Sequence, residues 1–150
     1  MNIDTNSPVF ARREIIIEAS IEKVWNIQTG IDRWSEWQPD ITSAKLNGDL
    51  KAGTIFRWKA KGLGIVSTLH TVEPNRRIGW TGISLGMSAI HNWTFEAQGN
   101  VTRVVTEESL NGWLTRLMKL FDPHFLEKSL ETSLKILRRQ VESDLKKKDT

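Results

Sequence analysis

A histidine and two large aromatic residues share one face of a predicted strand. In the stretch AIHNWTF, side chains of a strand alternate between faces, which places His91, Trp93 and Phe95 on the same side. A histidine ring in an apolar surrounding can donate or accept a proton near neutral pH. The alternative for His91 is a structural role, with its ring hydrogen-bonded to a neighbouring strand or helix.

A glutamate on the following strand is a possible partner for this histidine. Alternation over residues 101–110 puts Glu108 on one face and Glu107 on the other, although a one-residue bulge would exchange them. A turn at residues 98–100 could make His91 and Glu108 near neighbours across the hairpin, depending on the strand register. A desolvated carboxyl has a raised pKa, so this pair could enolise a ketone and promote an aldol closure. The alternative for Glu108 is a strand-end carboxylate that faces water or pairs with a lysine.

Other common site chemistries lack their motifs in this chain. There is no cysteine, no HExxH, no histidine pair on one helix face and no clustered acidic loop, so no metal site is expected. His70 and His124 have no partner at a suitable spacing. The G-x-S-x-G elbow of serine hydrolases is absent, and GLG at residues 62–64 is a turn rather than a phosphate loop. No cofactor is therefore predicted.

The composition is typical of a single globular domain. The chain has 150 residues, 39% of them hydrophobic and 26% charged, which predicts one domain over residues 1–150. The net charge is only +3 and the charges outside the tail are mixed in sign, so nucleic acid is not an expected partner. The sequence has no apolar run of membrane-spanning length, no secretory signal and no cysteine, which favours a cytoplasmic location. The ending KKKDT is expected to be a frayed, solvated helix end.

Turn residues divide the chain into one strand, two short helices, six strands and a helical C-terminus. Residues 10–18 are predicted as the first strand, followed by a helix from Ser20 to Gly30 and a short helical piece that stops before Pro39. The six further strands are predicted at residues 41–46, 54–59, 65–73, 78–83, 87–97 and 101–110. Their short connections require antiparallel neighbours, and the fold class is therefore α+β.

The C-terminal third has helical periodicity. An apolar stripe runs from Trp113 to Phe121. Asp122 is predicted to cap a new helical segment whose first position is Pro123, with a kink or short break there. Beyond it, apolar residues recur every three or four positions, at Leu126, Leu130, Leu134, Leu137, Val141 and Leu145. This pattern predicts one face of an amphipathic helix roughly 35 Å long.

Four stretches resemble a known family. They are IEASIEKVWNIQTGIDRWSEWQPDI, GTIFRWKAKGLGIVSTLHTVEPNRRIGWTG, AIHNWTFEAQGNVTRVVTEES and the terminal helix. Together they resemble the SRPBCC (START/Bet v 1-like) superfamily, and within it the polyketide cyclase/dehydrase-like group, over residues 10–145. The resemblance implies a helix-grip fold, in which a seven-stranded curved antiparallel sheet surrounds a long C-terminal helix, with two short helices after the first strand. It also implies a hydrophobic cavity between sheet and helix, but no common catalytic motif.

Aromatic residues on the inward faces are the candidates for the cavity wall. The chain has seven tryptophans and no tyrosine, which supplies large rigid apolar surfaces. The strand candidates are Phe56, Trp58, Trp80, Trp93 and Phe95, with His91 and Glu108 as the polar groups among them. Trp34 and Trp37 are expected to gate the cavity, and Trp113 and Leu117 to close its other wall. The alternative for each aromatic residue is plain core packing.

The leading hypothesis is that the protein binds a hydrophobic or aromatic small molecule, such as a lipid or polyketide-like compound. A concave face packed solid would contradict it. The second hypothesis is a cyclase or dehydratase that uses Glu108 and His91 as proton carriers, which requires both side chains to point into one cavity. The third is a protein-interaction module resembling chaperone activators, which requires an exposed apolar patch. The sequence leaves the oligomeric state open and predicts flexible ends at residues 1–8 and 146–150.

Overall fold

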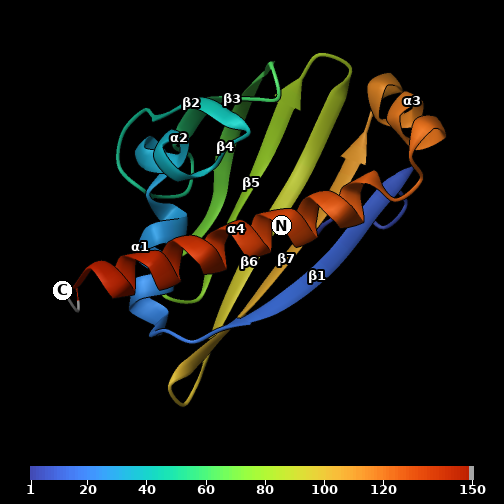
Figure 1. The fold of residues 1–150 in the computed structure, drawn as a ribbon. Helices are drawn as coiled ribbons and strands as arrows, with labels where there is room; N and C mark the ends of the chain where they lie inside the picture. Colours follow the sequence, from blue (N-terminus) through green and yellow to red (C-terminus); the bar gives the residue numbers. More distant parts are fainter. Residues whose placement is uncertain (149–150) are drawn as a thin grey trace.

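The structure, a computed structural model, describes residues 1–148 as seven strands, four α-helices and one short 3-10 helix. Figure 1 shows one curved sheet with a long helix lying across its concave face. The elements in chain order are β1 (Val9–Ile17), α1 (Ile21–Thr29), η1 (Ile31–Arg33), α2 (Trp34–Trp37), β2 (Ile41–Leu46), β3 (Ile55–Ala60), β4 (Leu63–Glu73), β5 (Arg77–Ser84), β6 (Met87–Gln98), β7 (Val101–Asn111), α3 (Trp113–Phe121) and α4 (Phe125–Lys148).

The sheet is fully antiparallel and has the order β1-β7-β6-β5-β4-β3-β2. Strands β2 to β7 pair in chain order through short turns, and β1 closes the sheet by pairing with β7. This arrangement confirms the predicted helix-grip fold, with strand boundaries within two residues of those expected. The predicted hairpin between β6 and β7 turns at Gly99 and Asn100, and its register has no bulge that would exchange the faces.

The core lies between the concave face of the sheet and α4. The predicted apolar positions of α4 are almost fully buried at Leu126, Leu130, Leu134, Leu137 and Val141. Helix α4 packs over β1, β7 and α1, and an ion pair between Lys23 and Asp144 joins α1 to α4. Burying this stripe stabilises the helix more than its intrinsic propensity does, since isolated helices are marginal in water.

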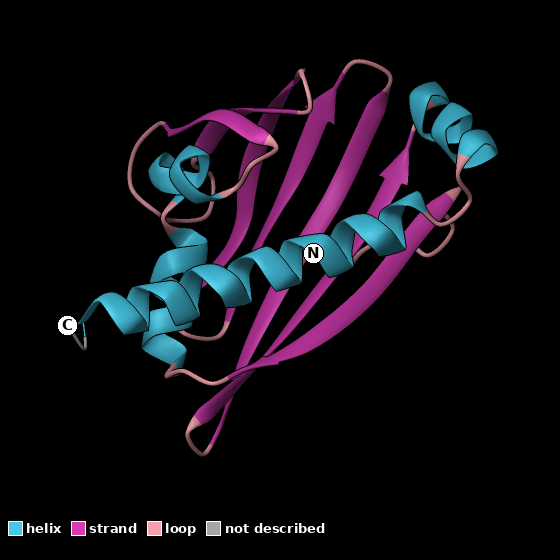
Figure 2. Cartoon of the chain, in the orientation of Figure 1, coloured by secondary structure: helices cyan, strands magenta, loops and turns pink. Residues whose placement is uncertain are grey.

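The predicted break between the C-terminal helices is a complete separation. Helix α3 ends at Phe121, and the backbone N–H of His124 donates to Asp122 Oδ1 across the turn at 3.1 Å. Lys128 Nζ donates to Asp122 Oδ2 at 3.0 Å and ties this turn to the first turn of α4. Pro123 therefore lies in the linker instead of in the first helical turn, and α3 takes a direction of its own, as Figure 2 shows.

The N-terminal residues, which the sequence predicts as a flexible tail, have hydrogen bonds to the sheet. The backbone N–H of Asp4 donates to Ser109 Oγ at 3.0 Å, and Asn111 Nδ2 donates to Ser7 Oγ at 2.7 Å. Ser7 is buried as a result. At the other end, α4 continues to Lys148, and the expected flexibility of residues 149–150 lies outside the described residues. Across residues 1–148, no helix combines the length and apolar character needed to span a membrane.

Candidate functional site

The concave face is largely filled by an interlocked cluster of aromatic rings. Trp34, from the short helix α2, lies with its ring centroid 5.6 Å from Phe56, 5.4 Å from Trp58 and 5.6 Å from Trp80. The Phe56 and Trp58 contacts are edge-to-face, an arrangement that aromatic rings favour. The indole N–H of Trp34 donates to the carbonyl oxygen of Gln28 at 2.9 Å, which fixes the ring in the centre of the cluster.

A cavity of about 70 Å³ lies in this face, between the aromatic cluster and α4. Its aromatic wall consists of Trp34, Trp58, Trp80, Trp93 and His91. Its other lining residues are Gln28, Gln38, Ile41 and Ser133, which come from α1, the loop after α2, β2 and α4. The volume is well below the roughly 300–1,000 Å³ of ordinary small-molecule pockets. The cavity between sheet and helix that the family resemblance implies is therefore small in this structure.

Trp93 contributes a polar group with no partner. Its side chain lines the cavity and is 2% exposed, and the buried indole nitrogen Nε1 has no hydrogen-bond partner among the described residues. By contrast, Trp34 Nε1 is bonded to Gln28, and Trp58 Nε1 donates to Ser67 Oγ at 3.0 Å. A buried donor without an acceptor is costly, so Trp93 Nε1 is a position where a ligand acceptor would be stabilised.

His91 and Glu108 are brought into contact, as the hairpin alternation predicts. They are direct partners in the β6–β7 ladder, and His91 Nδ1 lies 3.3 Å from Glu108 Oε2. The other ring nitrogen, His91 Nε2, is hydrogen-bonded to Thr106 Oγ1 at 2.8 Å. The side chains of His91 and Glu108 are only 11% and 17% exposed. Both ring nitrogens thus have partners within the protein.

Burial determines the charge of this pair. Desolvation raises the pKa of the Glu108 carboxyl from 4.5 to about 8 and lowers the pKa of the His91 ring from 6.5 to about 3. An ion pair would shift both values in the opposite directions, so burial outweighs the mutual attraction of the charges. Near neutral pH the contact is therefore a hydrogen bond between neutral groups, in which the protonated carboxyl donates to His91 Nδ1 and Nε2–H faces Thr106.

The other predicted site residues lie away from the cavity. Phe56 is fully buried within the aromatic cluster, and Phe95 packs edge-on against Trp25 with centroids 5.4 Å apart, so both are core residues. Trp37 is half-buried against the same core. Neither Trp37 nor Glu108 is among the residues that line the cavity.

Trp113 and Leu117 do not close the other wall of the cavity. Their side chains are 61% and 42% exposed, because α3 points its apolar stripe toward solvent. The backbone explains this orientation. Gly112 has φ +109°, and a Cβ there would lie 2.2 Å from the carbonyl oxygen of Gly86, so the chain turns sharply just before α3. Helix α3 packs on the β5–β6 turn through its first residues, since a Cβ on Gly86 would come within 2.6 Å of the Trp113 ring and 2.9 Å of Leu114 Cβ.

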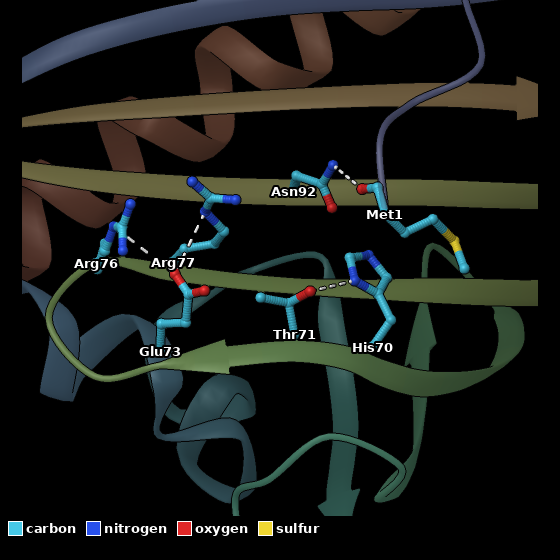
Figure 3. Close-up of polar contacts among 7 residues, drawn as sticks. All are labelled: Met1, His70, Thr71, Glu73, Arg76, Arg77 and Asn92. Atoms are coloured by element: carbon cyan, nitrogen blue, oxygen red, sulfur yellow. Dashed lines mark hydrogen bonds and ion pairs between the residues drawn. The ribbon is translucent and has the colours of Figure 1, made fainter.

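A second polar cluster lies on the convex face, around the histidine that lacks a partner in the sequence pattern. Figure 3 shows His70 Nδ1 hydrogen-bonded to Thr71 Oγ1 at 2.8 Å and Asn92 Nδ2 donating to the carbonyl oxygen of Met1 at 2.9 Å. Both side chains lie over Gly79, where a Cβ would come within 2.4 Å of each. Burial, followed by the charge of the N-terminus, lowers the pKa of His70. Among residues 1–148, no group of three or more acidic or histidine side chains is arranged to hold a metal ion.

Comparison with known proteins places this fold in a family. A family profile described as "Polyketide cyclase / dehydrase and lipid transport" matches residues 9–142. Searching the curated proteins gives no match. A hypothetical protein from Helicobacter pylori is similar in structure, with 18% identity, 93% of this chain and 91% of that chain covered, and a TM-score of 0.83.

Two further solved structures have the same fold. The aromatase/cyclase Zhui from Streptomyces sp. R1128 is 10% identical, with 91% of this chain and 95% of that chain covered and a TM-score of 0.79. A START superfamily protein from Mycobacterium smegmatis is 16% identical, with 89% and 97% covered and a TM-score of 0.75. At these identities the structures support the fold alone. Since the family profile spans nearly the whole chain, this protein belongs to the polyketide cyclase/dehydrase and lipid transport family.

Proposed function

We propose that the protein binds a small aromatic molecule carrying a hydrogen-bond acceptor, in the cavity beside His91. The observation that carries this proposal is the unpartnered, buried Nε1 of Trp93 in a cavity whose wall includes four other aromatic rings. Flat rings favour a flat apolar ligand, and a carbonyl or similar oxygen would satisfy the free indole donor. Membership of a family described by cyclisation and lipid transport is consistent with an apolar ligand.

The ligand has to enlarge the cavity as it binds. At about 70 Å³, the cavity has roughly half the volume of an engineered apolar cavity that admits benzene. Trp58 and Gln38 are the lining residues best able to move, because both are only partly buried and Gln38 follows the four-residue helix α2. Binding therefore requires Trp58 to swing away from Trp34, which changes the environment of two indole rings.

Replacing Trp93 by Phe is expected to weaken the binding of acetylnaphthalene about tenfold, the size of one lost hydrogen bond to a buried donor. Ethylnaphthalene has nearly the same shape but no acceptor, so its affinity is expected to stay the same. Tryptophan fluorescence titration measures both affinities, and native mass spectrometry of the freshly purified protein measures any ligand already bound.

Trp80→Phe is the matched control, because it removes a similar volume from the same wall while Trp93 keeps its donor. Trp80→Phe should change the affinities for acetylnaphthalene and ethylnaphthalene by the same factor. If neither compound binds to the unsubstituted protein, the proposed small-molecule site is wrong. If Trp93→Phe weakens both compounds to the same extent, the indole donor has no role in recognition.

A second candidate function is proton transfer at a ketone, supported by the contact between His91 and Glu108. His91 lines the cavity and Glu108 does not, so the carboxyl reaches a ligand only when the cavity enlarges. With its pKa raised to about 8, an ionised Glu108 is a stronger base than an ordinary carboxylate and can remove a proton next to a carbonyl group. Returning a deuteron from the solvent to the resulting enolate completes the exchange.

The acetyl methyl group of acetylnaphthalene is expected to incorporate deuterium from D₂O faster in the presence of the protein, and more so above pH of about 8. Mass spectrometry of the recovered ketone measures this exchange. Glu108→Gln should abolish the protein-dependent rate without changing acetylnaphthalene binding. Exchange at the background rate in the unsubstituted protein would exclude proton transfer while leaving the binding proposal intact.

A further inference from the structure

Helix α3 presents its most apolar stripe to solvent. Trp113, Leu117, Leu120 and Phe121 recur at spacings of four, three and one, which places them on one helical face. With Leu85 at the tip of the β5–β6 turn, these residues form what we call the α3 patch. Their side chains are exposed by 42% to 84%. This is the reverse of the usual surface helix, which turns its apolar face to the core.

The outward orientation of α3 is fixed by contacts on its opposite side. Thr115 is fully buried and its hydroxyl donates to the carbonyl oxygen of Asn111 at 3.0 Å. The backbone N–H of Leu114 donates to the carbonyl oxygen of Gly86 at 3.0 Å, and Lys119 Nζ donates to that of Pro8 at 2.9 Å. The helix therefore cannot roll to bury its apolar stripe without breaking these bonds.

Positive charge borders the α3 patch. Helix α3 contains Arg116 and Lys119 and no acidic residue. Within residues 1–148, neither of them forms an ion pair, whereas the Asp122 that follows α3 is paired with Lys128. An apolar face of Trp, Leu and Phe beside uncompensated basic side chains is typical of helices that lie in the interfacial region of a lipid bilayer.

The size and place of the patch also favour a lipid surface over a second protein. A standard protein interface uses about 20–30 residues on each side, far more than one nine-residue helix and one turn provide. A short helix needs only to insert its apolar side chains at the level of the headgroups. Figure 2 shows α3 standing at one end of the sheet, where a flat surface can approach it without touching α1 or α2.

We infer that α3 docks this protein on the surface of an anionic lipid bilayer, with the α3 patch inserted among the lipids and Arg116 facing the acidic headgroups. The docking helix lies apart from the ligand cavity, because none of the cavity-lining residues belongs to α3. Docking and ligand binding are thus tested by separate substitutions.

Sedimentation with vesicles of phosphatidylcholine containing about a third phosphatidylserine tests this inference directly. The unsubstituted protein is expected to sediment with these vesicles and less with pure phosphatidylcholine. The double variant Leu120→Ser/Phe121→Ser should bind at least about tenfold more weakly, since two large apolar side chains no longer insert. Arg116→Gln should weaken vesicle binding about fivefold. Raising the salt concentration should also weaken vesicle binding.

Ile83→Ser is the matched control, because Ile83 is also exposed and apolar but lies on β5, outside the patch. It should leave vesicle binding unchanged. The inference is overturned if the unsubstituted protein stays in the supernatant, or if the double variant binds as well as the unsubstituted protein does. It is also overturned if light scattering shows a dimer that the double variant loses, since a second copy would then cover the patch.

Discussion

Raising the pH from about 6.5 to about 8.5 is expected to lower the free energy of unfolding by about 2 kcal/mol through Glu108 alone. In the folded protein the pKa of this carboxyl is raised from 4.5 to about 8 by burial. The folded state therefore keeps a proton that the unfolded state has already released. Between these two pKa values the unfolded state binds fewer protons, so stability falls as the pH rises.

His91 opposes this trend at lower pH. Its pKa is lowered from 6.5 to about 3, so below pH 6.5 the unfolded state binds a proton that the folded state does not. That contribution lowers stability as the pH falls toward 3. Between 4.5 and 6.5 the two slopes have opposite signs and nearly cancel. The pair therefore predicts a plateau of stability across this range, with a fall on either side of it.

Glu108→Gln isolates the alkaline side of this profile. The carboxamide has almost the same shape, and its N–H can replace the protonated carboxyl as the donor to His91 Nδ1. Urea denaturation is expected to show that the stability of the variant relative to the unsubstituted protein increases by about 2 kcal/mol between pH of about 6.5 and pH of about 8.5.

Glu107→Gln serves as the comparison, since Glu107 is the next residue along β7 and faces the opposite side of the sheet, where Asn92 Nδ2 donates to it at 3.2 Å. The free energy of unfolding of Glu107→Gln should change with pH in the same way as that of the unsubstituted protein. A profile for Glu108→Gln that also falls in parallel between about pH 6.5 and 8.5 would mean that Glu108 is ionised in the folded state. The contact between His91 and Glu108 would then not be a hydrogen bond between neutral groups.

The sequence predicts the strands of this fold well because local patterns determine them. Alternation alone puts His91, Trp93 and Phe95 on one face of β6, and all three are buried on the concave side. The two-residue turn at Gly99 and Asn100 then sets the register that pairs His91 with Glu108. Turn chemistry and alternation act over a few residues, so both can be predicted without knowledge of the tertiary structure.

The ligand cavity depends on contacts that sequence patterns do not contain. Gln28, Gln38 and Ser133 line it, yet they come from α1, the loop after α2 and α4, which meet only in the folded chain. Trp34 could be expected to gate the cavity from its place in the second short helix. Trp34 instead fills the concave face, and its hydrogen bond to Gln28, six residues earlier, holds it there.

The position of α3 shows a different limit of sequence prediction. The stripe from Trp113 to Phe121 has clear helical periodicity, and helical periodicity normally indicates a face that packs on the core. Periodicity identifies the face but not what covers it. The sharp turn at Gly112 and the bond from Leu114 to Gly86 orient the helix, and both depend on the β5–β6 turn, about 26 residues earlier in the chain. The predicted wall of Trp113 and Leu117 is therefore an exposed patch.

Replacing Trp34 by Ala is expected to lower the free energy of unfolding by about 3–5 kcal/mol, the largest effect of any substitution considered for this protein. Trp34 is 2% exposed, and its ring contacts those of Phe56, Trp58 and Trp80 at once. Its removal leaves a void in the centre of the concave face and deprives the Gln28 carbonyl oxygen of its donor. Trp34→Phe keeps a ring but not the donor, and should cost about 1–2 kcal/mol.

Trp113→Ala is the control for tryptophan loss as such, because Trp113 is 61% exposed and should change stability by less than about 0.5 kcal/mol. Urea denaturation measures all three variants. The void should also join the existing cavity, since Trp34 forms part of its wall. Trp34→Ala is therefore expected to bind ethylnaphthalene more tightly than the unsubstituted protein, because Trp58 no longer has to move to make room for the ligand. A variant that loses stability without gaining affinity would mean that the surrounding side chains collapse into the void, and that the concave face is a packed core rather than a ligand site.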